Sequence, residues 1–379
     1  MMVWLRRRGV VLALAGAAIL AVVDIAWLQT LHYRVALPDF YVYYLAAQIG
    51  SAHGWATMYD PSVFLPIVTD AVGKPLPYLN PPELAWIVQP LSWLPYALAA
   101  GLWAVLLLSA LASTWYLAAP GTGIVKAAHA AAAMVLLPAF VSIFIGQVSL
   151  VIVAAVAISW WLLQRERPWL AGIALAALFL KPQAAFVVPP VLLLAGYWRV
   201  VLGWLAATAP LILLSLLAVG TSVFHDIQQS MAAVHNVPGP IQMSLERQLP
   251  SSMALAGVAF VLVASMVVAI RSRGTGPSIP VAAGLLASIA VSPYINFYDL
   301  SAPLLAGWLI LRTNPPRWQE RVTFAMYVPL YLAPLLPLLT LACLCGWLAS
   351  LAWLPTHQSA VQSGRGAGRE GREGGNAAA

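Results

Sequence analysis

Long apolar runs recur along most of the chain, and this feature limits the possible folds more than any other. A helix needs about 20 apolar residues to cross the hydrocarbon core of a bilayer. The chain is 62% apolar and only 8% charged, whereas soluble domains carry about 25% charged residues. We therefore predict an all-α polytopic membrane protein, a bundle of about 10–12 transmembrane helices. The apolar runs lie at 9–30, 93–119, 127–144, 148–163, 169–180, 183–196, 200–219, 253–270, 277–292, 299–311, 322–338 and 339–354.

Basic residues are distributed unevenly between the two sides of these predicted spans. Lys and Arg concentrate in the cytosolic loops of membrane proteins. A cytosolic N-terminus places all but four of the 19 Lys and Arg residues on the cytosolic side. The net charge of +7 is therefore a topology signal, and no nucleic-acid partner is predicted. We expect a multi-pass protein of the inner cell membrane, surrounded by membrane lipids. The four basic residues left outside are Arg34, Lys74, Lys181 and Arg247.

Two longer polar segments interrupt the apolar pattern, and this topology puts both on the outer face. They cover about residues 29–91 and 220–252, whereas the predicted cytosolic loops are only a few residues long. Residues 1–355 are expected to form one transmembrane domain. The Gly- and Arg-rich residues 356–379 have the low-complexity composition of a disordered cytosolic tail. Any chemistry is therefore expected at the outer face.

Asp39 is the first carboxylate beyond the first predicted span, and aromatic residues such as Phe40 and Tyr41 follow it directly. Apolar surroundings raise the pKa of a carboxyl group and suit it to act as a general base near neutral pH. Asp is also a favoured residue at the start of a helix, where its side chain caps free backbone N–H groups. The sequence is compatible with both roles.

Lys181 interrupts an otherwise apolar stretch near the predicted outer face. A charge inside a membrane segment is costly and marks a candidate functional site. The alternative is a lysine whose apolar stem lies in the membrane while its ammonium group reaches the interface. Gln147, in a turn between two runs, and Arg247, in the second outer segment, are expected at the same level.

The polar motifs follow one another in a fixed order along the chain. They are Asp39 with Tyr43-Tyr44-x-Ala-Ala, Tyr59-Asp60-Pro61, Pro77-Tyr78-x-x-Pro81-Pro82, Pro90-Leu91-x-x-Leu94-Pro95, Gly146-Gln147-x-x-Leu150, Ala171-Gly172, Lys181-Pro182-Gln183, Ser292-Pro293-Tyr294 and Tyr298-Asp299. This ordered set resembles glycosyltransferase family 87 over about residues 10–340, which is nearly all of the chain except the tail.

The resemblance implies a GT-C-like catalytic domain over residues 1–355 and a hexosyltransferase activity. The sugar, mannose first, would move from a polyprenyl-phosphate donor to a hydroxyl of a lipid or glycan acceptor on the outer side of the membrane. The catalytic base of the family lies in the first outer loop, at the position of Asp39. We expect phosphate binding by Lys181, Arg247 and Gln147, and substrate binding by Tyr43, Tyr44, Tyr78, Asn80, Tyr298 and Asp299.

The residues also favour a lipid-linked donor independently of the resemblance. Enzymes that use sugar nucleotides need a nucleotide-binding domain of about 100 residues or more. No predicted cytosolic loop is that long, and the chain contains no Asp-x-Asp motif for a metal-bound nucleotide. We predict a metal-independent enzyme without a cofactor. The main alternative is a transporter or flippase of lipid-linked glycans, which makes no bond and would place charges at mid-membrane in two related halves.

Overall fold

The computed structural model describes residues 18–26, 28–29, 32–235 and 243–354. Every regular element in these ranges is helical, which confirms the all-α class. Half of the first predicted span (9–30) and the tail at 356–379 lie outside the described residues. Tyr331 on α18 (Tyr327–Tyr331) donates a hydrogen bond of 2.7 Å to Asp24 in the helical residues 18–26. This contact attaches the described part of the first helix to the rest of the bundle.

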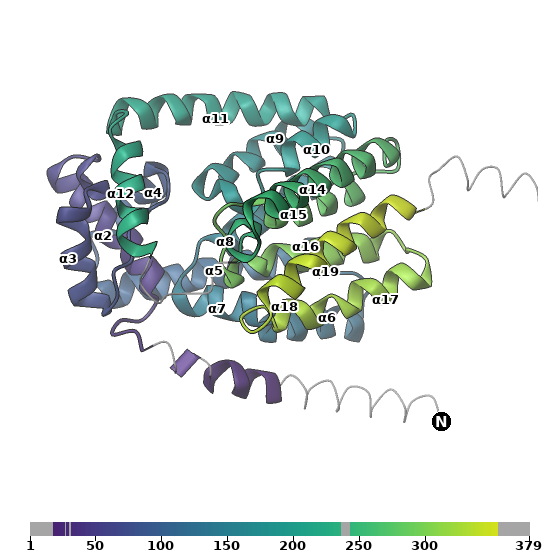
Figure 1. The fold of residues 1–379 in the computed structure, drawn as a ribbon, viewed down its shortest axis with the longest axis horizontal. Coiled ribbons are helices and arrows are strands. Elements are labelled where there is room, and N and C mark those ends of the chain that lie inside the picture. The colour runs from purple at the N-terminus through teal and green to yellow at the C-terminus, as the bar shows by residue number, and fades with distance from the viewer. Residues whose placement is uncertain (1–17, 27, 30–31, 236–242, 355–379) are drawn as a thin grey trace, which may run out of the picture.

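The first outer segment folds into short helices that begin at prolines. The helices are α2 (Pro38–His53), η1 (Thr57–Tyr59), α3 (Pro61–Val72) and α4 (Pro82–Ser92). Proline suits a helix start because its fixed φ is helical and its missing N–H would have no partner there. Together with α12 (Val223–His235) from the second outer segment, α2, α3 and α4 gather at one end of the molecule in Figure 1.

Three helices are long and apolar enough to cross a membrane, namely α5 (Tyr96–Ala118), α11 (Trp198–Val219) and α14 (Ser251–Arg271). A fourth span results if α6 (Gly123–Val135) and α7 (Leu137–Ile145) count as one helix bent by 58°. The protein is therefore an integral membrane protein.

The apolar runs predicted about ten to twelve transmembrane helices. The described residues contain fewer helices that are long enough to cross a membrane. The other described runs also fold as helices, but in pieces too short to count as full spans, several of which begin at a proline. These are α8 (Ser149–Leu163), α9 (Pro168–Leu175), η2 (Ala176–Leu180), η3 (Pro182–Ala184), α10 (Val188–Leu194), α15 (Ser278–Val291), η4 (Phe297–Ser301), α16 (Ala302–Arg312), α17 (Arg317–Ala325), α18 (Tyr327–Tyr331), α19 (Pro337–Ser350) and η5 (Leu351–Trp353). The short helix α13 (Leu245–Gln248) lies in the second outer segment.

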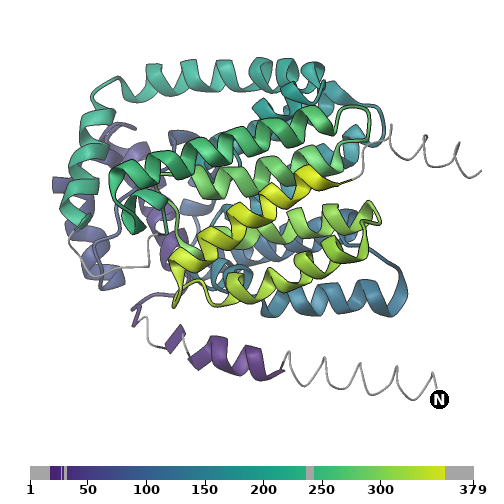
Figure 2. The same cartoon turned by 45° about the vertical axis from the view of Figure 1, so that its right-hand side comes forward.

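Small residues bring the helices of the bundle close together, as is usual in membranes. On α15 a side chain at Gly284 would place its Cβ 2.7 Å from Cα of Val188 on α10. On α9 a Cβ at Gly172 would lie 2.2 Å from the carbonyl oxygen of Val200 on α11. The second contact fixes α11 through α9, and Figures 1 and 2 show α11 along one edge of the bundle.

The alternation of helix directions gives a testable topology. After both native cysteines are replaced by serine, a cysteine at exposed Ser51 or Ser222 should react with a membrane-impermeant thiol reagent in intact cells. A cysteine at exposed Gln164 or Glu320 should react only after the cells are opened. The reverse pattern would place the outer segments in the cytosol and contradict the predicted orientation.

Candidate active site

A cavity of about 100 Å³ lies where the start of α2 meets the turn between α7 and α8. Residues from six separate stretches of the chain form its wall, and both the predicted base and the predicted cation are among them. The lining residues are Tyr33, Asp39, Val42, Tyr43, Leu76, Pro77, Leu79, Asn80, Ile145, Gln147, Lys181, Gln183, Tyr294 and Tyr298.

Asp39 lies in the first turn of α2, but its side chain does not cap the helix. Leu37 occupies the N-cap position, and no side chain caps the free N–H groups there. The carboxylate of Asp39 lines the cavity, and its Oδ2 accepts a hydrogen bond of 2.6 Å from Nε2 of Gln147. Of the two roles compatible with the sequence, the geometry therefore favours a group that faces a substrate.

Burial raises the pKa of Asp39 to about 7, because the protein around it solvates the charged form less well than water does. The positive charge of Lys181 opposes this rise, the negative charge of Asp299 adds to it, and the hydrogen bond from Gln147 opposes it. A carboxyl group with a pKa near 7 is well matched to proton transfer at neutral pH.

The turn between α7 and α8 brings Gln147 to Asp39. Gly146 ends α7 with φ of 79°, a left-handed conformation that favours glycine. A Cβ at Gly146 would lie 2.7 Å from Cβ of Phe40, so the turn packs directly against the start of α2. The indole N–H of Trp103 on α5 donates to the carbonyl oxygen of Gly146 at 2.8 Å and holds the turn from the other side.

Lys181 forms a buried ion pair with Asp299 at the wall of the cavity. Its ammonium group also donates to Oγ of Ser149 at 3.0 Å, and Ser149 donates to Oδ1 of Asp299 at 2.6 Å. The backbone N–H of Asn296 donates to Oδ2 of the same carboxylate at 3.1 Å. The side chain of Lys181 is 4% exposed, so Lys181 does not extend to the membrane interface as the snorkelling alternative requires.

Three of the predicted substrate-binding residues line the cavity beside Lys181 and Asp39. Tyr43 donates through its hydroxyl to Oε1 of Gln147 at 2.6 Å, and Lys181 lies over the Tyr298 ring at 5.1 Å from its centre. Asn80 also lines the cavity, and its buried Nδ2 makes no hydrogen bond with the described residues.

Tyr44, Tyr78 and Arg247, which the sequence also predicted as site residues, do not line this cavity. Tyr44 donates to the carbonyl oxygen of Leu94 at 2.8 Å, and Tyr78 donates to that of Pro81 at 2.6 Å. These bonds hold the outer segment together. Arg247 lies exposed on α13. Asp299 contacts the cavity only through Lys181.

Three polar lining residues were missed by the sequence prediction, in addition to the apolar ones. Gln183 and Tyr294 lie within motifs that were recognised, Lys181-Pro182-Gln183 and Ser292-Pro293-Tyr294, so the motifs themselves were the available signal. Tyr33 precedes α2 and belongs to none of the motifs. In the part of the chain that the structure describes, no group of three His, Cys, Asp or Glu side chains is placed to hold a metal ion.

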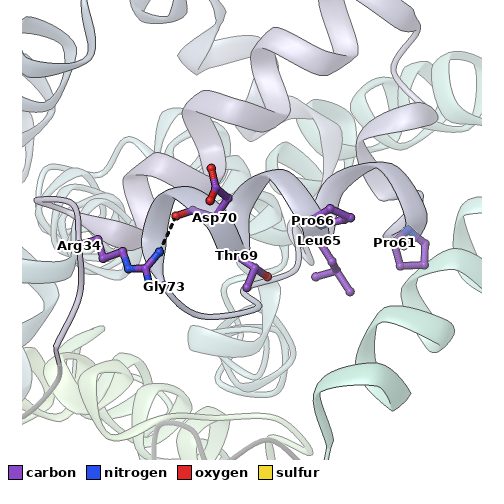
Figure 3. A pocket seen from close by; sticks show the side chains of 7 residues that line it. All are labelled: Arg34, Pro61, Leu65, Pro66, Thr69, Asp70 and Gly73. Atoms are coloured by element: carbon purple, nitrogen blue, oxygen red, sulfur yellow. Dashed lines mark hydrogen bonds between the residues drawn. The ribbon is translucent and has the colours of Figure 1, made fainter.

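A second, wider hollow of about 600 Å³ lies on the surface of α3 (Figure 3). There the guanidinium group of Arg34 donates to the carbonyl oxygen of Asp70 at 3.1 Å. Both residues are exposed, and the rest of the wall is largely α3 itself. The hollow lacks the buried, convergent polar groups of the first cavity, which is therefore the better candidate site.

The fold and the cavity define an integral membrane protein of helices with a carboxylate and a lysine facing one small polar cavity. The sequence model of glycosyltransferase family 87 matches residues 78–293, more than half of the chain. The chain belongs to glycosyltransferase family 87, which confirms the resemblance seen in the motifs. The match includes Asn80, Gln147 and Lys181. Neither the curated proteins nor the solved structures gave a match.

The ion pair predicts a particular pattern of stability. Lys181→Met should lower the free energy of unfolding by about 3–5 kcal/mol, because it leaves the Asp299 carboxylate buried and unpaired. The double variant Lys181→Met with Asp299→Asn removes both charges and should recover most of that loss. Thermal unfolding in detergent measures both effects. A single variant as stable as the unmodified protein would contradict a buried ion pair.

Proposed function

We propose that this glycosyltransferase moves a sugar from a polyprenyl-phosphate donor to an acceptor hydroxyl at the outer face of the membrane. The observation that carries the proposal is the presence of Asp39 and Lys181 on the wall of one cavity. A transfer of this kind needs a base for the hydroxyl and a cation for the departing phosphate, and these two side chains are of the required types.

In the proposed reaction, Asp39 takes the proton of the acceptor hydroxyl while the hydroxyl oxygen bonds to the anomeric carbon of the sugar. The bond between that carbon and the phosphate oxygen breaks, and its electron pair leaves with the polyprenyl phosphate. A single displacement with one base inverts the configuration at the anomeric carbon. The reaction needs no oxidant, and one lipid-linked phosphate needs only one cationic partner.

Lys181 is well placed for the phosphate because its ion pair does not use all of its donors. An ammonium group has three N–H donors, and two of them serve Asp299 and Ser149. The third is available to an oxygen of the leaving phosphate. Asp299 and Ser149 fix the position of the ammonium group, so little ordering is needed when the donor binds.

A membrane-embedded donor suits both the residues and the surroundings. In the predicted topology, the cavity lies where a polyprenyl chain can remain in lipid while its phosphate reaches Lys181. Mannose is the first choice for the sugar, followed by arabinose or another pentose. With the predicted topology, the N-terminus is cytosolic and the cavity opens to the outer face.

Purified protein tests the proposal directly. We expect transfer from a polyprenyl-phosphate sugar to membrane glycolipids and none from the matching sugar nucleotide. A deletion strain should accumulate the lipid-linked donor or a glycan that lacks one sugar. Complete glycan trapped inside the deletion strain would instead indicate a flippase, and transfer from the sugar nucleotide would exclude the lipid-linked donor.

The raised pKa of Asp39 predicts the pH dependence of transfer. Only the ionised carboxylate accepts a proton, so kcat/KM should be high above about pH 7 and fall at lower pH as Asp39 becomes protonated. Asp39→Asn should lower transfer by about 10²–10⁴-fold above pH 7, and the difference should shrink at lower pH as Asp39 of the unmodified protein becomes protonated. Rates of the unmodified protein and of Asp39→Asn across the pH range, at equal protein concentration, check this prediction.

Stability separates this role from a structural one. Folding raises the pKa of Asp39. Between about pH 4 and 7, the Asp39 carboxyl group is therefore largely protonated in the folded state but has already lost its proton in the unfolded state. Ionised Asp39 therefore destabilises the fold at pH 8, and Asp39→Asn should unfold at the same or a higher temperature. Asp60→Asn is the control, because hydrogen bonds from Ser62 lower the pKa of that half-buried carboxylate. Full activity of Asp39→Asn would remove Asp39 from the mechanism.

A further inference from the structure

Hydrogen bonds fix the direction in which the side-chain amide of Gln147 faces. The backbone N–H of Val148 lies 3.0 Å from Oε1 of Gln147, and a backbone N–H can only donate. The atom facing Val148 is therefore the amide oxygen. The hydroxyl of Tyr43 donates to the same oxygen at 2.6 Å. The amide nitrogen of Gln147 consequently faces Asp39, 2.6 Å from its Oδ2.

This orientation gives the two carboxylate oxygens of Asp39 different roles. An amide N–H group can donate but not accept, so Oδ2 of Asp39 must accept in every protonation state. A proton on the Asp39 carboxyl group is then held by Oδ1. Oδ1 is thus the oxygen left to take a proton from a molecule in the cavity.

Gln147 is held rigidly enough to impose this choice. It is 5% exposed, and its own backbone N–H donates to the carbonyl oxygen of Ser142 at 2.8 Å. The preceding residue, Gly146, packs against Phe40 one residue after Asp39. The amide and the carboxylate are therefore mounted on two backbone segments in direct contact.

We propose that Gln147 is a positioning residue for the base, which selects Oδ1 of Asp39 as the oxygen that removes the proton of the acceptor hydroxyl. The inference rests on the proposed function and replaces the phosphate-binding role expected for Gln147. In the transfer step the hydroxyl proton moves to Oδ1, the hydroxyl oxygen bonds to the anomeric carbon, and the phosphate leaves with the electron pair. The bond from Gln147 to Oδ2 remains in place throughout.

Asp39 also interacts with groups on the other elements around the cavity. Lys181 favours the ionised form of Asp39, and the carboxylate of Asp299 disfavours it. The other groups are tyrosine hydroxyls, which stay neutral near pH 7. Replacing Gln147 alone leaves these groups in place, although in Gln147→Met the Tyr43 hydroxyl loses the amide oxygen that accepts its hydrogen bond. These groups are Tyr33, Tyr43, Lys181, Tyr294, Tyr298 and Asp299.

The test is the pH profile of kcat/KM with a polyprenyl-phosphate sugar as donor. Gln147→Glu keeps an oxygen toward Val148 but turns a second carboxylate toward Asp39, which disfavours the ionised form of Asp39. The acidic limb of the profile, where kcat/KM falls at low pH, should therefore move up by about two pH units. Gln147→Met has a similar length and removes the donor to Asp39, together with the oxygen that accepts from Val148 and Tyr43. Its limb should move up by about one pH unit, and its kcat should fall about tenfold.

Gln183→Glu is the matched control, because Gln183 lines the same cavity and receives the same change in charge. If the hydrogen bond from Gln147 matters, the limb should move less in Gln183→Glu than in Gln147→Glu. Equal shifts would mean that only the added charge matters, which would overturn the inference. Thermal unfolding of each variant in detergent identifies loss of folded protein, and Gln147→Met preserves the test if Gln147→Glu does not fold.

The remaining outcomes distinguish this inference from the proposed function. A higher KM for the donor with an unmoved acidic limb in both Gln147 variants would support phosphate binding by Gln147 and overturn the positioning role. Full activity of Asp39→Asn would overturn the proposed base itself. An inactive Asp39→Asn together with an unmoved limb in the Gln147 variants would leave the base in place and reject its positioning by Gln147.

Discussion

The buried ion pair between Lys181 and Asp299 is the interaction on which the rest of the site depends. An ionised lysine in apolar surroundings needs a partner, and Asp299 lies 118 residues away in the chain. Ser149 bonds to both members of the pair, so the starts of α8 and η4 and the break between η2 and η3 are held at one point. The same turn that carries Ser149 carries Gln147 two residues earlier, which links the ion pair to Asp39. The proposed base and the proposed phosphate-binding cation therefore share one support.

Aromatic packing helps to hold the first outer segment against the rest of the helical bundle. The rings of Phe40 on α2 and Trp103 on α5 stack with their centres 5.0 Å apart, and the hydroxyl of Tyr96 donates to the carbonyl oxygen of Leu37 at 3.1 Å. Farther along, Ser215 on α11 donates to the buried carboxylate of Glu83 on α4. Helices α2 and α4 are thus fastened to two different candidate spans. Movement of α2 relative to α5 would carry Asp39 away from Gln147.

The sequence predicted the helical class, the membrane location and the two charged residues of the cavity, because each depends on local composition. It could also separate Tyr43 from Tyr44 in principle, since Tyr43 lies four residues after Asp39 on the same helical face. The pairing of Gln147 with Asp39 could not be predicted, because 108 residues separate them. In the described residues, fewer helices are long enough to span a membrane than the number of apolar runs suggested. Some of those runs, such as 169–180 and 183–196 on either side of Lys181-Pro182, are short, and apolar composition does not show whether a short run crosses the membrane.

The two sides of the cavity differ in how freely they can change during evolution. On one side, each polar group is held by hydrogen bonds to other site residues, as Gln147 is to Asp39 and Lys181 is to Ser149. A substitution there disturbs the positions of several site residues at once. The other side includes Leu76, Pro77 and Leu79, which contribute apolar surface from the segment between α3 and α4. Substitutions in that segment alter the shape presented to a sugar without touching the base or the ion pair. Enzymes of this design can therefore diverge in sugar preference while their chemistry stays the same.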